Sequence, residues 1–173
     1  MKLVVTTGAT VTFRRLLARV LDPQFLDELE SAGFTDIVVQ YGAETRNGVD
    51  VSAQYVSTLG EMPPSVTLVG LTNDVPALLK GADVVVTHAG TGSILDAVRS
   101  GYSVVVVPNS ELMDNHQQEI ATAFAGLGVC EAVDVTELSV SHLVQAARTQ
   151  YKQLPPPQSI ESVLAYELQA GAR

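Results

Sequence analysis

The sequence predicts an α/β fold in which a parallel, Rossmann-like sheet carries helices on both faces. Six short valine-rich runs have the length and composition of buried strands. They lie at residues 2–7, 36–41, 65–71, 82–87, 103–107 and 129–133. Segments with apolar residues at helical spacing separate these runs. Such an alternation of strand and helix is typical of a doubly wound parallel sheet.

The connections between the strands carry helix signals. Apolar residues recur at i, i+3, i+4 and i+7 from Phe13, so a first helix is expected there with Thr10 or Thr12 as its N-cap. Further helices are predicted at residues 23–32, 73–81, 93–99, 114–127 and 140–147. Residues 42–64 show little periodicity, and the only element expected among them is a weak strand around residues 52–57.

The chain is long enough for one domain. Its 173 residues favour a single core, which we place at residues 1–154. Three consecutive prolines at residues 155–157 form a stiff break. Beyond them, residues 159–169 carry apolar side chains at helical spacing, so residues 155–173 are expected to form a Pro-hinged helix. That helix has to pack either on its own sheet or on a partner chain, and the sequence leaves both open.

Composition limits the classes of partner. The formal net charge is −9, with only 10 Lys and Arg residues, which excludes a broad nucleic-acid-binding surface and an anionic membrane surface as direct partners. No apolar run approaches the ~20 residues of a membrane span. Cys130 is the only cysteine and is expected to be a buried strand residue. We therefore expect a cytoplasmic protein.

Gly8, Ala9 and Thr10 form a small-residue turn between the first strand and the first helix. A strand, such a turn and a helix together point backbone N–H groups and the positive end of a helix dipole at an anion. An ordinary βα turn has the same composition, and a single glycine is no dinucleotide fingerprint. These residues alone therefore leave phosphate binding and a simple connection equally open.

A second polar turn, His88-Ala89-Gly90-Thr91-Gly92-Ser93, follows the fourth predicted strand. Its glycines permit a close backbone approach, its hydroxyls can donate hydrogen bonds, and its histidine can donate to a phosphate oxygen, an assembly that suits a diphosphate. Alternatively, Ser93 is only an N-cap, in a capping box with Asp96. That alternative leaves the glycines and the histidine unexplained.

A third polar stretch, Asp114-Asn115-His116-Gln117-Gln118, begins a helix after the fifth predicted strand. Capping by Asp114 and a solvated first turn would account for it. However, neighbouring amide donors and acceptors also suit the hydroxyls of a sugar. Because the carboxyl ends of parallel strands face one crevice, the second and third stretches are predicted to build one site.

Together these motifs resemble a known family. The runs THAGTGSILDAV and VPNSELMDNHQQEIA are similar to the nucleotide-sugar-binding half of GT-B glycosyltransferases. They most resemble the small subunits of the two-subunit UDP-N-acetylglucosamine (UDP-GlcNAc) transferases of dolichol-linked oligosaccharide synthesis. The opening VVTTGATVTFRRLL and the strand VVQYG extend the resemblance, which is strongest over residues 82–124. Bacterial peptidoglycan-precursor GlcNAc transferases are more distant relatives.

The resemblance implies a role for each motif. The first turn would lie near the phosphates, and Asp96, where relatives more often have Glu, would bind the ribose hydroxyls. Asn115, Gln117 and Gln118 would face the GlcNAc. The leaving diphosphate would be held by the second turn, with its histidine as the stabilising donor: His88, Gly90, Thr91, Gly92 and Ser93.

The resemblance also implies half of an enzyme. The donor would be UDP-GlcNAc, with no tightly bound cofactor or metal, and the acceptor a lipid diphosphate bound by a separate, membrane-anchored subunit. The reaction would add the second GlcNAc to dolichyl-diphosphate-GlcNAc with inversion, at the cytosolic face of the endoplasmic reticulum. No residue stands out as the general base. Two alternatives remain open, a self-sufficient small nucleotide-sugar enzyme and a non-catalytic nucleotide-binding module.

Overall fold

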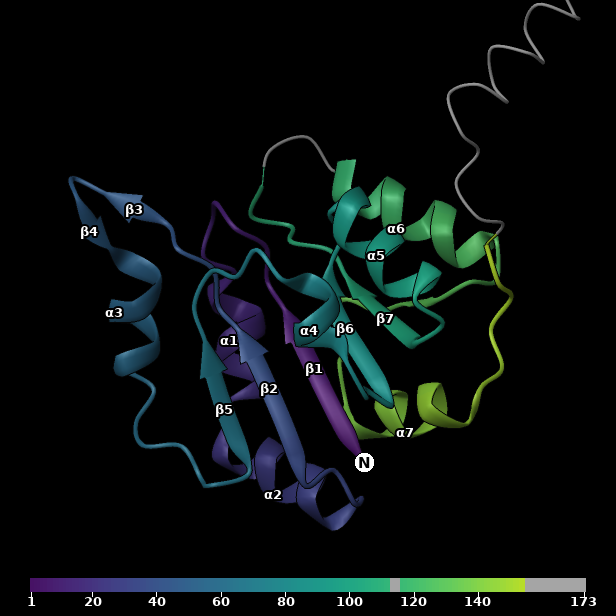
Figure 1. The fold of residues 1–173 in the computed structure, drawn as a ribbon, viewed down its shortest axis with the longest axis horizontal. Helices are drawn as coiled ribbons and strands as arrows, with labels where there is room; N and C mark the ends of the chain where they lie inside the picture. The colour runs from purple at the N-terminus through teal and green to yellow at the C-terminus, as the bar shows by residue number, and fades with distance from the viewer. Residues whose placement is uncertain (113–115, 155–173) are drawn as a thin grey trace, which may run out of the picture.

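The computed structural model describes residues 1–112 and 116–154. Its main sheet contains six strands in the order β5-β2-β1-β6-β7-β8, and every neighbouring pair is parallel. The strands are β1 (Lys2–Thr6), β2 (Asp36–Gln40), β5 (Val66–Val69), β6 (Val84–His88), β7 (Ser103–Val107) and β8 (Glu131–Ala132). Figure 1 shows this arrangement. The predicted fold class is confirmed, and the strand order reverses between β1 and β6.

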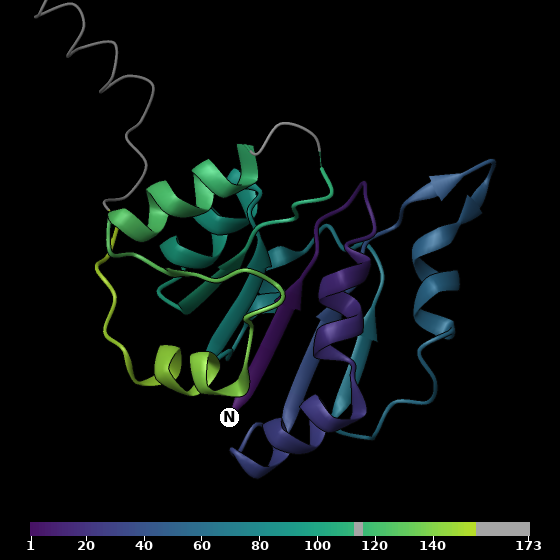
Figure 2. The same cartoon turned by 180° about the vertical axis from the view of Figure 1, so that it is seen from behind.

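Helices cover both faces of the sheet, as Figures 1 and 2 show from opposite sides. One face carries α1 (Arg14–Val20), α2 (Pro23–Ser31) and α7 (Val140–Arg148), and the other carries α4 (Val75–Leu79), α5 (Thr91–Arg99) and α6 (His116–Gly126).

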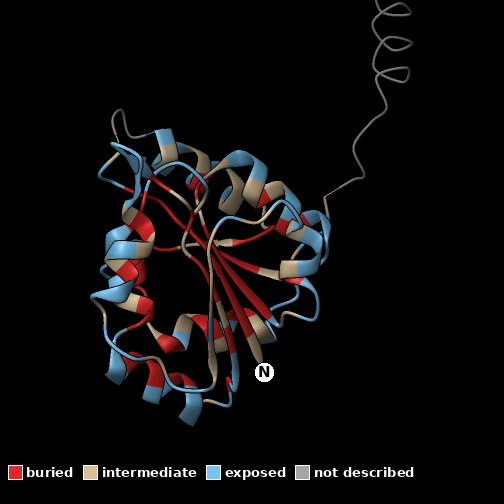
Figure 3. Cartoon of the chain, turned by 60° about the vertical axis from the view of Figure 1, so that its left-hand side comes forward, coloured by how far each residue is buried: buried red, intermediate tan, exposed pale blue. Residues whose placement is uncertain are grey.

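Each face has its own apolar core, because successive strand residues point to opposite sides. Val84 and Val86 of β6 pack into the core beneath α1, α2 and α7, whereas Val85 packs beneath α4, α5 and α6. The central strands are therefore buried throughout, as Figure 3 shows. Burial on both faces explains the uninterrupted valine runs of the sequence.

The segment between β2 and β5 differs from its prediction. The strand expected around residues 52–57 is wrong, because α3 (Val51–Ser57) occupies that position. The Asp50 carboxylate starts this helix by accepting a hydrogen bond of 2.9 Å from the N–H of Ala53. Before α3, β3 (Thr45–Arg46) and β4 (Val49–Asp50) form a hairpin that projects away from the sheet (Figures 1 and 2).

The start of α1 also differs from its prediction. The helix begins at Arg14, and its N-cap position is Phe13, whose side chain makes no cap hydrogen bond. Neither Thr10 nor Thr12 is the N-cap, because the chain turns into the helix after both of them. The hydroxyl group of Thr12 is instead hydrogen-bonded to the hydroxyl group of Ser52, in the first turn of α3.

Cys130 is buried, as predicted, immediately before β8, and its burial raises the pKa of the thiol to about 11. Across residues 1–112 and 116–154, no helix is long and apolar enough to cross a membrane. The expected C-terminal helix at residues 159–169 lies outside the described residues. The division into residues 1–154 and 155–173 therefore stays a prediction.

Candidate functional site

The predicted site lies at the carboxyl edge of the sheet, where the strand order reverses. Ligands of doubly wound sheets bind at this switch point. Two connections meet there, which we call the first loop (residues 7–13, between β1 and α1) and the α5 turn (residues 88–93, at the end of β6 and the start of α5). Because β1 and β6 are hydrogen-bonded neighbours, the two connections lie side by side.

The His88 side chain sits between two glycines, one from each connection. A Cβ atom on Gly8 would lie 2.9 Å from both Cε1 and Nε2 of His88, and one on Gly90 would overlap Nε2. Gly8 also has φ +89°, in the left-handed region that favours glycine. Both glycines are therefore needed to admit the imidazole, which joins the first loop to the α5 turn.

The buried position of His88 determines its charge. Burial lowers the pKa of the imidazole below its usual value, and interaction with the Thr6 backbone offsets part of that shift. The Nδ1 atom is buried without a hydrogen-bond partner. His88 is therefore neutral at pH 7, and a neutral imidazole carries one N–H group and no positive charge.

The N-terminus of α5 is open. The helix begins at Thr91 with Gly90 as its N-cap, so the predicted N-cap role and capping box of Ser93 are wrong by three residues. No side chain caps this end. Thr91 and Gly92 are exposed, and no atom lies within 4 Å of a Cβ placed on Gly92. The first N–H groups of the helix, which have no intrahelical partner, are therefore available to an anion.

A cavity of about 90 Å³ joins the predicted phosphate and sugar residues. It is lined by residues of the first loop, His88, the end of β7 and α6: Thr7, Gly8, Ala9, Thr10, Val11, Phe13, His88, Asn109, Leu112 and Gln117. The Oε1 atom of Gln117 accepts a hydrogen bond of 2.8 Å from the N–H of Asn109, so its amide nitrogen remains available. Gln118 is exposed, and Asn115 lies outside the described residues.

A second cavity, of about 130 Å³, lies on the other side of Gly8 and was missed by sequence reasoning. It is lined by residues from β1, β2, the β5–α4 connection and α4 to α5: Thr6, Gly8, Ala9, Gln40, Leu71, Thr72, Val75, Leu78, Leu79, Val85, Ser93 and Ala97. Asp96 is exposed and lies three residues after Ser93, on the same side of α5. This cavity could not be predicted because the sequence does not reveal that β5 lies beside β2.

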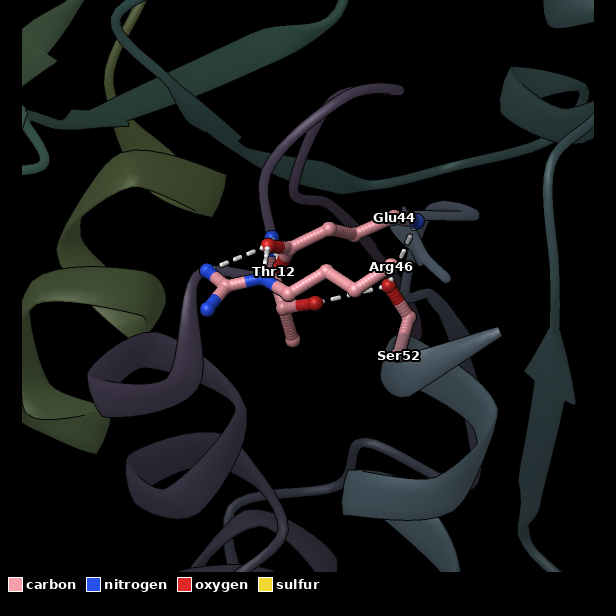
Figure 4. Close-up of polar contacts among 4 residues, drawn as sticks. All are labelled: Thr12, Glu44, Arg46 and Ser52. Atoms are coloured by element: carbon pink, nitrogen blue, oxygen red, sulfur yellow. Dashed lines mark hydrogen bonds and ion pairs between the residues drawn. The ribbon is translucent and has the colours of Figure 1, made fainter. Parts of the chain in front are cut away.

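A carboxylate of the protein itself lies at the end of the first loop, just before α1. Figure 4 shows Oε2 of Glu44 accepting a hydrogen bond of 2.9 Å from the N–H of Thr12. Oε1 of Glu44 pairs with Arg46 at 2.6 Å. These hydrogen bonds hold the pKa of Glu44 at about 2, although the residue is only 8% exposed. Sequence reasoning missed Glu44, because it lies in a segment expected to be a surface loop.

The structure thus brings most of the predicted residues to one edge of the sheet. The first loop, His88 and Gln117 share one cavity, and Ser93 shares the other with the first loop. Thr91, Gly92 and Asp96 are exposed on α5. Within residues 1–112 and 116–154, no group of three His, Cys, Asp or Glu residues could hold a metal ion.

The fold and the position of the site define a Rossmann-like domain of the GT-B type. The family described as the glycosyltransferase family 28 C-terminal domain matches residues 2–162. The chain belongs to this family. The resemblance found in the sequence is therefore confirmed.

Curated relatives agree with the family assignment. A protein of Saccharomyces cerevisiae, named UDP-N-acetylglucosamine transferase subunit ALG13, is 33% identical, and the match covers 86% of this chain and 85% of the relative. The proteins of the same name in Yarrowia lipolytica and Candida albicans are 42% and 28% identical over 70% and 79% of this chain. The chain spans just under three fifths of the length of these last two, at 59% and 57%.

Solved structures show the same fold. An NMR structure of ALG13 is 28% identical and superimposes with a TM-score of 0.59, covering 91% of this chain and 90% of that chain. The crystal structure of Acinetobacter baumannii MurG is 16% identical, with a TM-score of 0.64 over 98% of this chain and 52% of the MurG chain. At that identity the likeness to MurG concerns the fold alone, and it extends over about half of MurG.

Proposed function

We propose that this chain is the donor-binding, catalytic subunit of an inverting glycosyltransferase that uses UDP-GlcNAc. The observation that carries the proposal is the meeting of His88, the glycines on either side of it and the open N-terminus of α5 at the switch point of the sheet. An uncapped helix N-terminus with glycines beside it favours a phosphate ligand. The name shared by its curated relatives supports UDP-GlcNAc as the particular donor.

The two cavities suit the two ends of such a donor. The apolar walls of the larger cavity, which include Leu71 and Val75, fit a nucleobase, and Asp96 beside it supplies a carboxylate for the ribose hydroxyls. On the other side of Gly8, the amide nitrogen of Gln117 faces the smaller cavity. A sugar there would place its C1–phosphate bond near His88, between the two cavities.

In the proposed reaction, an acceptor hydroxyl oxygen attacks C1 of GlcNAc and the C1–oxygen bond to the diphosphate breaks. UDP leaves with the bonding electrons, the configuration at C1 inverts, and the hydroxyl proton passes to a general base supplied by the partner or at the boundary with it. The residues lining the two cavities include no lysine or arginine. The N–H groups of α5 and neutral His88 therefore stabilise the departing diphosphate through dipoles, which act strongly when water is excluded.

The acceptor is proposed to be dolichyl-diphosphate-GlcNAc, held by a membrane-anchored partner subunit at the cytosolic face of the endoplasmic reticulum. The name of its curated relatives supports a partner, because it contains the word subunit.

A transfer assay tests the proposal. The chain is incubated with UDP-GlcNAc and a lipid-diphosphate-GlcNAc acceptor, with and without membranes that contain the partner, and the extended lipid product is measured. Transfer that requires both the chain and the membranes is expected. Transfer by the chain alone would instead support a self-sufficient nucleotide-sugar enzyme. Failure to bind UDP-GlcNAc even in the complex would support a non-catalytic module.

A further inference from the structure

We propose that Glu44, together with Ser52, is a positioning residue for the donor, because it holds the first loop in place against His88. This inference rests on the proposed function, since the loop lines both cavities into which the donor is placed. We call residues 40–52 the clasp. Nothing in the clasp besides Gln40 lines a donor cavity, so its effect on the donor passes through the first loop.

The clasp fixes the beginning of the first loop through Gln40. The Oε1 atom of Gln40 accepts a hydrogen bond of 3.2 Å from the N–H of Thr7, and its Nε2 donates one of 3.0 Å to the carbonyl oxygen of Gly8. A Cβ on Gly42 would lie 2.9 Å from that same carbonyl oxygen, so the two segments are in direct contact. The N–H of Thr7 and the carbonyl group of Gly8 are therefore both held by the clasp.

Glu44 and Ser52 fix the end of the first loop. Glu44 takes the N–H of Thr12, and the Ser52 hydroxyl lies 2.7 Å from the Thr12 hydroxyl. Ser52 also accepts a hydrogen bond of 2.9 Å from the N–H of Glu44, which closes a three-residue network. Figure 4 shows the network, with Arg46 placed across the Glu44 carboxylate. All three members of the network are buried.

His88 meets the first loop from the opposite side. Its ring packs on Gly8 with no room for a methyl group, while Gln40 and Gly42 contact Gly8 from the clasp side. The first loop is thus held between the clasp and the imidazole. A shift of the loop would alter both the seat of His88 and the lining of the two cavities.

The use of a buried carboxylate favours a positioning role over a purely stabilising one. Only the Glu44 side of the ion pair is buried, since the Arg46 side chain is exposed. Burying a charged group costs desolvation, but its hydrogen bonds can select one conformation of the chain. Here the selected conformation is that of a glycine-containing loop, which has few restraints of its own. Displacements of the order of 1 Å in a substrate site are costly to catalysis. The Glu44 hydrogen bond therefore matters because it restrains a loop that lines the donor cavities.

The test compares Glu44→Gln with Asp50→Ala in the complex with the membrane partner. Asp50→Ala removes the N-cap of α3, in the same part of the chain, without touching the network. Glu44→Gln is expected to raise the KM for UDP-GlcNAc about tenfold and to leave kcat within about twofold, because it removes uniform binding. Asp50→Ala is expected to lower Tm, because α3 loses its cap, while leaving KM within about twofold of the wild-type value. Equal KM values for the two variants would overturn the proposal.

Amide hydrogen exchange on the same variants separates this inference from the proposed function. Residues 8–12 should exchange faster in Glu44→Gln and at the wild-type rate in Asp50→Ala, with or without donor. If the wild-type complex fails to bind UDP-GlcNAc, the proposed function falls, and exchange still decides whether Glu44 holds the loop. If residues 8–12 exchange at the wild-type rate in Glu44→Gln, the positioning role is overturned even when transfer is normal.

Discussion

The first loop and the α5 turn are equivalent in topology and opposite in chemistry. Both follow a central parallel strand and lead into a helix at the same edge of the sheet. In the first loop, the backbone N–H next to the helix is taken by Glu44, and the threonine hydroxyl is taken by Ser52. In the α5 turn, no side chain caps the helix, and Thr91 and Gly92 are exposed.

This difference assigns the two helix ends to different tasks. The Glu44 carboxylate already lies just before α1, at the N–H of Thr12, so a second anion there would be repelled. The start of α5 has its N–H groups and its dipole still available. The donor diphosphate is therefore expected at α5, and the first loop is expected to form a wall beside it. Five predictions test this contrast.

The largest effect is expected from Gly90→Ala. Its φ of −80° suits alanine, but the new Cβ would overlap Nε2 of His88 and displace the ring. We expect kcat/KM for UDP-GlcNAc transfer to fall by about a thousandfold, because the imidazole and the helix start both move. Gly126→Ala is the control, since no atom lies within 4 Å of a Cβ placed there. Equal activity of the two variants would contradict the placement of His88 against the α5 turn.

His88→Ala should have the next largest effect, because the backbone of both connections stays in place. Loss of one preorganised donor to the departing diphosphate is expected to lower kcat about a hundredfold in the assembled enzyme. Folding should remain intact, since the imidazole Nδ1 has no hydrogen bond to lose. A thermal melt with transfer rates checks both points. Near-normal transfer by a folded variant would refute the diphosphate role.

Much of this contrast follows from the sequence. The valine runs predict the buried strands, and the polar residues after the strand expected at residues 82–87 predict a site at its carboxyl end. The sequence predicts a close backbone approach at Gly90 and Gly92. The structure places the His88 ring against Gly90 and also against Gly8, for which no close approach is predicted. The buried strands are confirmed, because they depend only on local spacing, while the ligand site stays a prediction drawn from the shared direction of parallel strands.

The remaining features depend on contacts between distant parts of the chain. Glu44 reaches Thr12 across 32 residues, and nothing in the local pattern of either one signals the pair. The helix at residues 51–57 was mistaken for a strand, since Val51, Ala53 and Tyr55 alternate with polar residues at the period of a strand. The larger cavity depends on the place of β5 in the sheet, and strand order is not encoded by periodicity.

Acidification should remove the stabilisation that the Glu44 carboxylate gives to the first loop. Its pKa is about 2 in the folded chain and 4.5 ordinarily, so its stabilisation is present above pH 4.5 and is lost as the pH falls toward 2. Wild type should exceed Glu44→Gln in unfolding free energy by about 2 kcal/mol at pH 7, and the gap should close over that window. For Tyr55→Phe, which loses a hydrogen bond to the Arg14 carbonyl, the gap should stay constant. Denaturant titrations across pH measure both.

The α5 turn should respond to acid in a different window. The pKa of His88 is lowered by burial, so the unfolded chain binds its proton more readily. The unfolding free energy should therefore fall as the pH drops below the ordinary histidine value of 6.5, and this part of the loss should be absent in His88→Ala. If wild type and His88→Ala lose the same unfolding free energy as the pH falls below 6.5, the buried imidazole does not distinguish the α5 turn from the first loop.

The smallest effect is expected from Asp96→Asn, which tests how far the donor extends along α5. Asp96 lies one turn after Ser93, outside the first-turn N–H groups, and is exposed. If its carboxylate accepts hydrogen bonds from the ribose, the amide should weaken UDP affinity about fivefold, the cost of one exposed charge-assisted hydrogen bond. Asp27→Asn, on the exposed face of α2, is the matched control for charge. Calorimetric titration with UDP should separate the two, since a general charge effect would strengthen binding equally in both.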